Sequence, residues 1–267
     1  MTVDYTEIYP KIYVYHNSIK DPNFFLKQSL NQYKIGWKDW SFFGRYIGIG
    51  GKTAKYKKFP TWEEFKESID LQENQQLSLE YIDKFYHNTK HYIDNNLITL
   101  NEWAYESSSL CEYDIAKGHD GEFSMAYHSD FIVPEKNWPG LKFEISVTTY
   151  LNDDYDDGEL CFAIDNDLFS YKPKAGDMII FPSRPPYFHG VRKHKNKNRY
   201  MIRGFWLSSY EGSLEWHEGL LKYGKEEWEK MQRIELEKYT IENIPSPSEY
   251  ASSYSRDNER LNIKWKI

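Results

Sequence analysis

Hydrophobic and polar residues alternate most clearly in FEISVTTYL, residues 143–151. Its odd-numbered positions begin with apolar residues and its even-numbered positions all carry polar atoms: Phe143, Ile145 and Val147 against Glu144, Ser146, Thr148 and Tyr150. Successive side chains of a strand point to opposite faces, so the segment predicts a strand with one apolar and one polar face. A polar face that points into a barrel-like sheet indicates a ligand cavity instead of a packed core.

Other short apolar segments surround this strand between residues 108 and 207. LCFAI, DMIIF and RYMIRGFW are each bounded by Gly, Pro or Asp, which punctuate strands. Short strands at such intervals are typical of a sandwich or a jelly roll. We therefore expect residues 108–207 to form a mainly β core.

Helical signals come before this core. The segment Ile12–Tyr15 is β-branched or aromatic and predicts a strand, and Asp21 before Pro22 then predicts the capped start of a helix. Thr61 and Glu64 have the spacing of a capping box at the start of a second helix. A third helix is predicted by one apolar stripe at helical spacing: Leu79, Ile82, Phe85, Thr89 and Ile93.

These patterns predict one domain in three zones. Residues 1–105 supply a strand and supporting helices, residues 108–207 supply the core, and residues 208–267 supply a helical extension. The extension carries an apolar stripe that is either one helix or a pair broken near Gly224. The terminal LNIKWKI alternates again and is expected to form a late strand.

Composition narrows the class of partner. The chain has 267 residues, a net charge of −7 and a sequence pI of about 5.7, so it lacks the basic surplus that binding to nucleic-acid phosphates requires. No apolar run approaches the ~18 residues of a membrane span, and the N-terminus does not have the pattern of a signal peptide. The two cysteines, Cys111 and Cys161, are expected to be reduced and buried. We expect a cytoplasmic protein that binds neither nucleic acid nor membrane.

The candidate chemistry lies in YHSDF. On a strand, His128 and Asp130 point to the same face, so two ligands converge on one metal ion. An H-x-D triplet alone is common by chance, but His189 follows within the same predicted core. Two His and one carboxylate are the ligand set of non-haem iron oxygenases. Arg199, on the next predicted strand, has the planar fork that binds a carboxylate with two hydrogen bonds.

At this point the stretch from Leu110 to Trp206 resembles the prolyl-hydroxylase-like branch of the Fe(II)/2-oxoglutarate-dependent dioxygenases. The matching segments, in order, are LCEYDIAKG, YHSDF, TTYLND, DDGELCF, PKAGDMIIFPS, FHGV and RYMIRGFW. The resemblance implies a double-stranded β-helix (a jelly-roll, cupin-like core) flanked by helices. It also implies that iron(II) is bound by His128, Asp130 and His189, and that 2-oxoglutarate is the cosubstrate.

The resemblance places the distal carboxylate of 2-oxoglutarate on Arg199 and Tyr150, with Tyr113 as a third residue. Tyr150 and Thr148 already lie on the polar face that the alternation predicts. The chain between Tyr113 and His128 is longer than the family pattern, which weakens the assignment of Tyr113.

A second arginine, Arg203, is an alternative residue for binding the distal carboxylate of the cosubstrate. Gly204 resembles an extra residue before Trp206 and suggests a β-bulge. Arg203 shares the strand parity of Arg199, so Arg203 is either the cosubstrate anchor or the partner of a substrate carboxylate. Arg199 is the preferred anchor.

The implied activity is hydroxylation of an unactivated C–H bond with dioxygen, while 2-oxoglutarate is converted to succinate. Because Asp130 is present, hydroxylation is expected instead of halogenation. The first substrate candidate is a prolyl residue in a peptide or protein, in an aromatic cleft formed by Phe131, Trp138 and Trp206. The alternative is a free amino acid or other small carboxylate bound by Arg203. A different class, a non-catalytic jelly-roll binding protein with a vestigial metal site, stays open.

Overall fold

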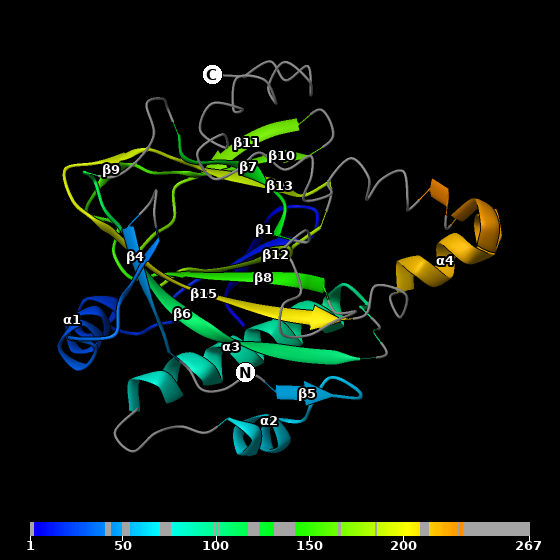
Figure 1. Ribbon diagram of the computed structural model, residues 1–267, viewed down its shortest axis with the longest axis horizontal. Coiled ribbons are helices and arrows are strands. Elements are labelled where there is room, and N and C mark those ends of the chain that lie inside the picture. Colours follow the sequence, from blue (N-terminus) through cyan, green and yellow to red (C-terminus); the bar gives the residue numbers. More distant parts are fainter. Residues whose placement is uncertain are drawn as a thin grey trace.

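Two facing antiparallel sheets form the centre of the protein, and helices cover the outer face of the larger sheet (Figure 1). The computed structural model describes residues 3–40, 44–49, 54–69, 76–98, 100, 102–116, 123–130, 142–164, 167–184, 186–208, 214–228 and 230–231.

The strands of the two sheets come from distant parts of the chain. The larger sheet has the order β1 (Tyr5–Tyr9), β2 (Ile12–Tyr15), β12 (Met178–Pro182), β8 (Lys142–Tyr150), β15 (Arg199–Ser208), β6 (Trp103–Tyr113), β4 (Gly44–Gly48) and β3 (Lys38–Trp40), and β5 (Ala54–Tyr56) also pairs with β6. The smaller sheet has the order β11 (Asp167–Tyr171), β10 (Leu160–Ile164), β13 (Phe188–Arg192) and β7 (Phe123–His128). A short ladder joins β9 (Asp156–Asp157) to β14 (His194–Lys195). This is the predicted jelly roll, in which the connections cross between two sheets.

The alternation of β8 separates the two halves of the core as expected. Ile145 and Val147 pack in the cluster that includes the helices, whereas Tyr150 packs in the cluster that includes Phe162 of the smaller sheet. The polar face of β8 therefore points inward, between the sheets.

The helices begin where the sequence predicts. In α1 (Pro22–Gln32) the Asp21 side chain accepts a hydrogen bond from Phe24 N at 2.9 Å, and α2 (Trp62–Ser68) has the complete Thr61–Glu64 capping box. α3 (Gln76–Asn95) buries the predicted stripe from Ile82 onward. None of the helices in the described part of the chain is long and apolar enough to cross a membrane.

The C-terminal zone is described only in part. α4 (Leu214–Tyr223) ends just before Gly224, whose φ of 75° interrupts the helix where a break was expected. A second helical segment follows it from residue 225. The expected late strand at residues 261–267 lies outside the described residues.

The expected bulge exists, but its extra residue belongs to β6 instead of β15. Arg203 is opposite Ser109 while Phe205 is opposite Glu106, so β15 advances two residues as β6 advances three. Gly204 is required for a different reason: a Cβ there would lie 2.6 Å from Ser108 Oγ. β15 therefore keeps regular parity, and Arg203 and Phe205 share the inner face with Arg199.

Candidate metal and cosubstrate site

Three potential metal ligands meet at one end of the space between the sheets. His128 ends β7, Asp130 follows it closely, and His189 lies on β13 directly opposite His128 in the β7–β13 ladder. Asp130 Oδ1 is 3.5 Å from His128 Nε2, and Asp130 Oδ2 is 3.4 Å from His189 Nε2. The three ligand atoms all lie within 4.8 Å of one another. Cross-strand pairing thus brings together residues that are distant in the sequence.

These separations fit a single metal ion. Ligand atoms about 2.1 Å from one ion, at right angles, lie about 3 Å apart. Two imidazole nitrogens and one carboxylate oxygen suit iron(II) and leave further coordination positions open to other ligands. Within the described residues this is the one cluster of three His, Cys or acidic side chains with such spacing.

Serine hydroxyls hold the carboxylate of Asp130 in place. Ser146, on the inner face of β8, donates to Asp130 Oδ2 at 2.6 Å, and its Oγ also lies 2.7 Å from Ser183 Oγ. Ser129 Oγ donates to Ser183 O at 2.6 Å. Outer hydrogen bonds of this kind orient ligands around a metal ion. Sequence reasoning placed Ser146 on the polar face but gave it no role.

The ionisation states of Asp130 and His189 suit a cation. Burial raises the pKa of Asp130, but the neighbouring His189 and His128 and the hydrogen bond from Ser146 together hold it below its usual value. Burial lowers the pKa of His189 to about 4, in spite of the nearby Asp130 carboxylate. Neutral imidazole and ionised carboxylate are the forms that bind metal.

Arg199 lies at the other end of the same inner face. Its side chain is fully buried, and its guanidinium lies 4.3 Å from the ring centroid of Tyr113 and 5.5 Å from that of Tyr150. Nη1 donates to Gly158 O at 3.4 Å and Nη2 to Met201 Sδ at 3.3 Å, while Nε has no hydrogen-bond partner among the residues that the structure describes. Within the described part of the chain no carboxylate forms an ion pair with Arg199. A buried cation without a counter-ion is costly, and a ligand carboxylate would compensate it.

Hydroxyl groups occupy the space between Arg199 and the three metal-ligand candidates. On neighbouring strands, Tyr150 is opposite Met201, Thr148 is opposite Arg203, and Ser146 is opposite Phe205. The hydroxyls of Thr148 and Tyr150 are buried and make no well-formed hydrogen bond with the described residues. Such a row of donors from a buried arginine to a metal site fits a dicarboxylate.

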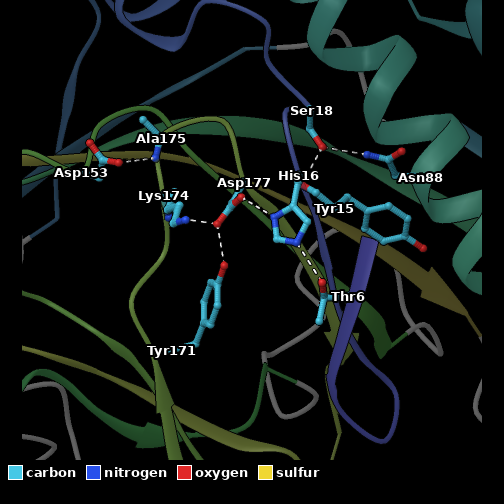
Figure 2. Close-up of polar contacts among 10 residues, drawn as sticks. All are labelled: Thr6, Tyr15, His16, Ser18, Asn88, Asp153, Tyr171, Lys174, Ala175 and Asp177. Atoms are coloured by element: carbon cyan, nitrogen blue, oxygen red, sulfur yellow. Dashed lines mark hydrogen bonds and ion pairs between the residues drawn. The ribbon is translucent and has the colours of Figure 1, made fainter. Parts of the chain in front are cut away.

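A network of partly buried polar contacts surrounds Asp177, the residue whose backbone carbonyl bonds to Tyr150; Figure 2 shows its side chains. Tyr150 N donates to Asp177 O at 2.9 Å, and the Asp177 carboxylate accepts from Tyr171 Oη at 2.8 Å and from Lys174 N at 2.9 Å. His16 Nδ1 lies 3.1 Å from the same carboxylate and so joins the N-terminal hairpin to this turn.

Arg203 lies nearer to the metal-ligand candidates than Arg199 does. Its guanidinium is 5.8 Å from the ring centroid of Tyr46 and 5.9 Å from that of Phe205, on the same inner face. Glu106 lies on β6 opposite Phe205, and burial raises its pKa. The charge of Arg203 partly opposes this rise, whereas the charge of Asp130 adds to it. Glu106 was missed by sequence reasoning, because only the strand pairing shows that it lies beside this site.

The structure does not support every expected cleft residue. Trp206 lies on the opposite face of β15, fully buried, with its ring 5.3 Å from Phe65 and 5.7 Å from Phe85. The prediction that Trp206 lines a substrate cleft is therefore wrong, because strand parity places Phe205 on the inner face instead. Phe131 and Trp138 lie outside the described residues.

Comparisons with known proteins agree with this geometry. Residues 111–207 match the 2OG-Fe(II) oxygenase superfamily. A PKHD-type hydroxylase of Prochlorococcus marinus (strain MIT 9515) is 32% identical over 162 residues, which is 58% of this chain and 65% of the relative. A PKHD-type hydroxylase of Prochlorococcus marinus (strain MIT 9312) is 40% identical over 80 residues, which is 30% of this chain and 34% of the relative. The chain thus spans between about a third and just under two thirds of the length of the curated relatives it matches.

A solved structure shares the fold. The prolyl hydroxylase from Trichoplax adhaerens, solved in complex with a peptide fragment of the hypoxia inducible factor oxygen degradation domain, superposes with a TM-score of 0.51. The match covers 75% of this chain and 85% of the other at 16% sequence identity.

Proposed function

We propose that this chain is an iron(II)- and 2-oxoglutarate-dependent hydroxylase, and the match of residues 111–207 to the 2OG-Fe(II) oxygenase superfamily supports this proposal. The observation that supports this most is the pairing of two features on one buried face. His128, Asp130 and His189 converge at one end, and at the other Arg199 is buried with no carboxylate partner among the described residues. A non-catalytic binding protein would need neither feature.

Each residue has a role in this proposal. His128, Asp130 and His189 would hold iron(II), and Ser146 would keep the Asp130 carboxylate oriented. Iron bound there supplies activation of dioxygen, coupled to the conversion of 2-oxoglutarate to succinate. The distal carboxylate of 2-oxoglutarate would be held by Arg199, together with Tyr150, Thr148 and Tyr113. Since Asp130 would occupy the coordination position that a halide would need, the expected outcome is hydroxylation and not halogenation.

For the substrate, we propose a prolyl residue in a peptide or protein as the first candidate. Support comes from the sequence resemblance to prolyl hydroxylases and from the two relatives, which are named PKHD-type hydroxylases. One observation favours a free amino acid as the second candidate. Arg203 and Glu106 lie beside Phe205 at the metal end of the inner face, where they offer partners to a carboxylate and an ammonium group.

Succinate formation from a panel of substrates tests this proposal. With iron(II), 2-oxoglutarate and dioxygen, proline-containing peptides should raise succinate above the uncoupled background, and Asp130→Ala should abolish the increase. The matched control is Asp83→Ala, which removes a half-exposed carboxylate from α3, on the outer face of the sheet. Arg203→Leu should spare peptide turnover and cripple turnover of a free amino acid. If no peptide and no amino acid raises succinate, the substrate assignment is wrong.

A further inference from the structure

A third tyrosine hydroxyl lies at the Arg199 end of the inner face and has no assigned role. Tyr155, in the turn between β8 and β9, is 3% exposed. Its hydroxyl is buried and makes no well-formed hydrogen bond with the described residues. Burial of a hydroxyl without a hydrogen-bond partner costs free energy, and a bound ligand that accepts a hydrogen bond from it would remove this cost.

The ring of Tyr155 is held from several sides. Lys172 Nζ lies 3.8 Å from the ring centroid and donates to Tyr155 O at 2.9 Å. The His194 ring meets it edge-on at 5.9 Å. Gly158, with φ of 74°, approaches so closely that a Cβ would lie 2.9 Å from Tyr155 Cε2 and 2.9 Å from His194 Cβ. The ring therefore has little freedom to turn its hydroxyl toward solvent.

The turn that fixes Tyr155 also contacts the buried arginine. Gly158 O accepts a hydrogen bond from Arg199 Nη1. Burial raises the pKa of Tyr155, and the nearby charge of Arg199 lowers it. The same two effects, in the same order, act on the pKa of Tyr150. Both hydroxyls thus lie within the field of one guanidinium, where negative charge is stabilised.

Counting donors and acceptors shows what a carboxylate bound to Arg199 would still need. An ionised carboxylate offers about four acceptor positions on its two oxygens. The fork of Arg199 can occupy two of these, which leaves two for neutral donors. Tyr150 and Tyr155 are the two tyrosines near Arg199 whose buried hydroxyls lack a well-formed bond within the described residues.

We propose that Tyr155 is a cosubstrate-binding residue, which donates a hydrogen bond to the distal carboxylate of 2-oxoglutarate beside Arg199 and Tyr150. This inference rests on the proposed function. It also explains the glycine at position 158, because any larger residue there would displace both Tyr155 and His194. The cosubstrate site would thus include a residue of the turn that follows β8.

Calorimetric binding of 2-oxoglutarate tests this role, with manganese(II) in place of iron. Tyr155→Phe should weaken 2-oxoglutarate binding roughly ten- to hundredfold, as expected for loss of one hydrogen bond to a charged group. Manganese binding should not change. The Tm of the ligand-free protein should stay the same or rise, because an unsatisfied hydroxyl has been removed.

The matched control is Tyr86→Phe, which removes a buried hydroxyl that donates to Pro60 O at 2.7 Å. Tyr86→Phe should lower the Tm and leave 2-oxoglutarate binding unchanged. If Tyr155→Phe behaves like Tyr86→Phe, the Tyr155 hydroxyl is structural and the inference is wrong. If the wild-type protein itself does not bind 2-oxoglutarate, the proposed function fails and this inference fails with it.

Discussion

The two sides of the larger sheet are both deeply buried, but the tyrosine hydroxyls on the two sides differ in their hydrogen bonding. On the helix side, Tyr81 and Tyr105 each lie 3.0 Å from Ser108 Oγ, and Tyr86 donates to Pro60 O. On the inner side, the hydroxyls of Tyr150 and Tyr155 make no well-formed bond with the described residues. Burial alone therefore does not distinguish a core from a binding site. For these tyrosine hydroxyls, the distinction lies in whether they already have hydrogen-bond partners.

Trp206→Ala tests the helix side and should give the largest effect. Trp206 is fully buried among Phe65, Phe85 and other rings, so its removal leaves a large cavity. We expect a loss of about 3–5 kcal/mol in the free energy of unfolding, measured by chemical denaturation. The affinity for 2-oxoglutarate of the remaining folded protein should stay close to that of the wild type. A large loss of affinity with little loss of stability would place Trp206 in the binding site after all.

Arg199→Met tests the inner side and should show the opposite pattern. The affinity for 2-oxoglutarate should fall by roughly 2–5 kcal/mol, because a desolvated carboxylate loses its charged partner. The ligand-free protein should keep its Tm or gain some, since a buried charge without a counter-ion has been replaced by an apolar side chain of similar length. If Arg203→Met reduces the affinity and Arg199→Met does not, the anchor is Arg203.

The local elements of the fold could be predicted from the sequence, because each one depends mainly on residues close together in the chain. Alternation gave both faces of β8, and the capping residues Asp21 and Thr61 gave the helix starts. The prediction that Gly204 is the extra residue of a bulge was wrong. The sequence indicated a bulge near this glycine, but only the strand pairing shows that the extra residue is in β6. Because β15 keeps regular parity, Trp206 faces the helices and not the space between the sheets.

The site was predictable in its ligands and incomplete in its supporting residues. The H-x-D spacing predicted that His128 and Asp130 converge, although β7 ends at His128, and the family resemblance assigned roles to His189 and Arg199. Glu106 and Tyr155 carry no such pattern. Their positions depend on cross-strand register and on a turn packed against Arg199, which are long-range contacts that the sequence does not display.

The most direct test of the account is the visible charge-transfer band of the iron(II)–2-oxoglutarate chelate, recorded without oxygen. The wild-type protein should develop the band when both components are added, and His128→Ala and Asp130→Ala should abolish it. Arg199→Met should retain it at a higher 2-oxoglutarate concentration, because the metal ligands remain. An unchanged band in both His128→Ala and Asp130→Ala would contradict the account, since these side chains would then not hold the metal.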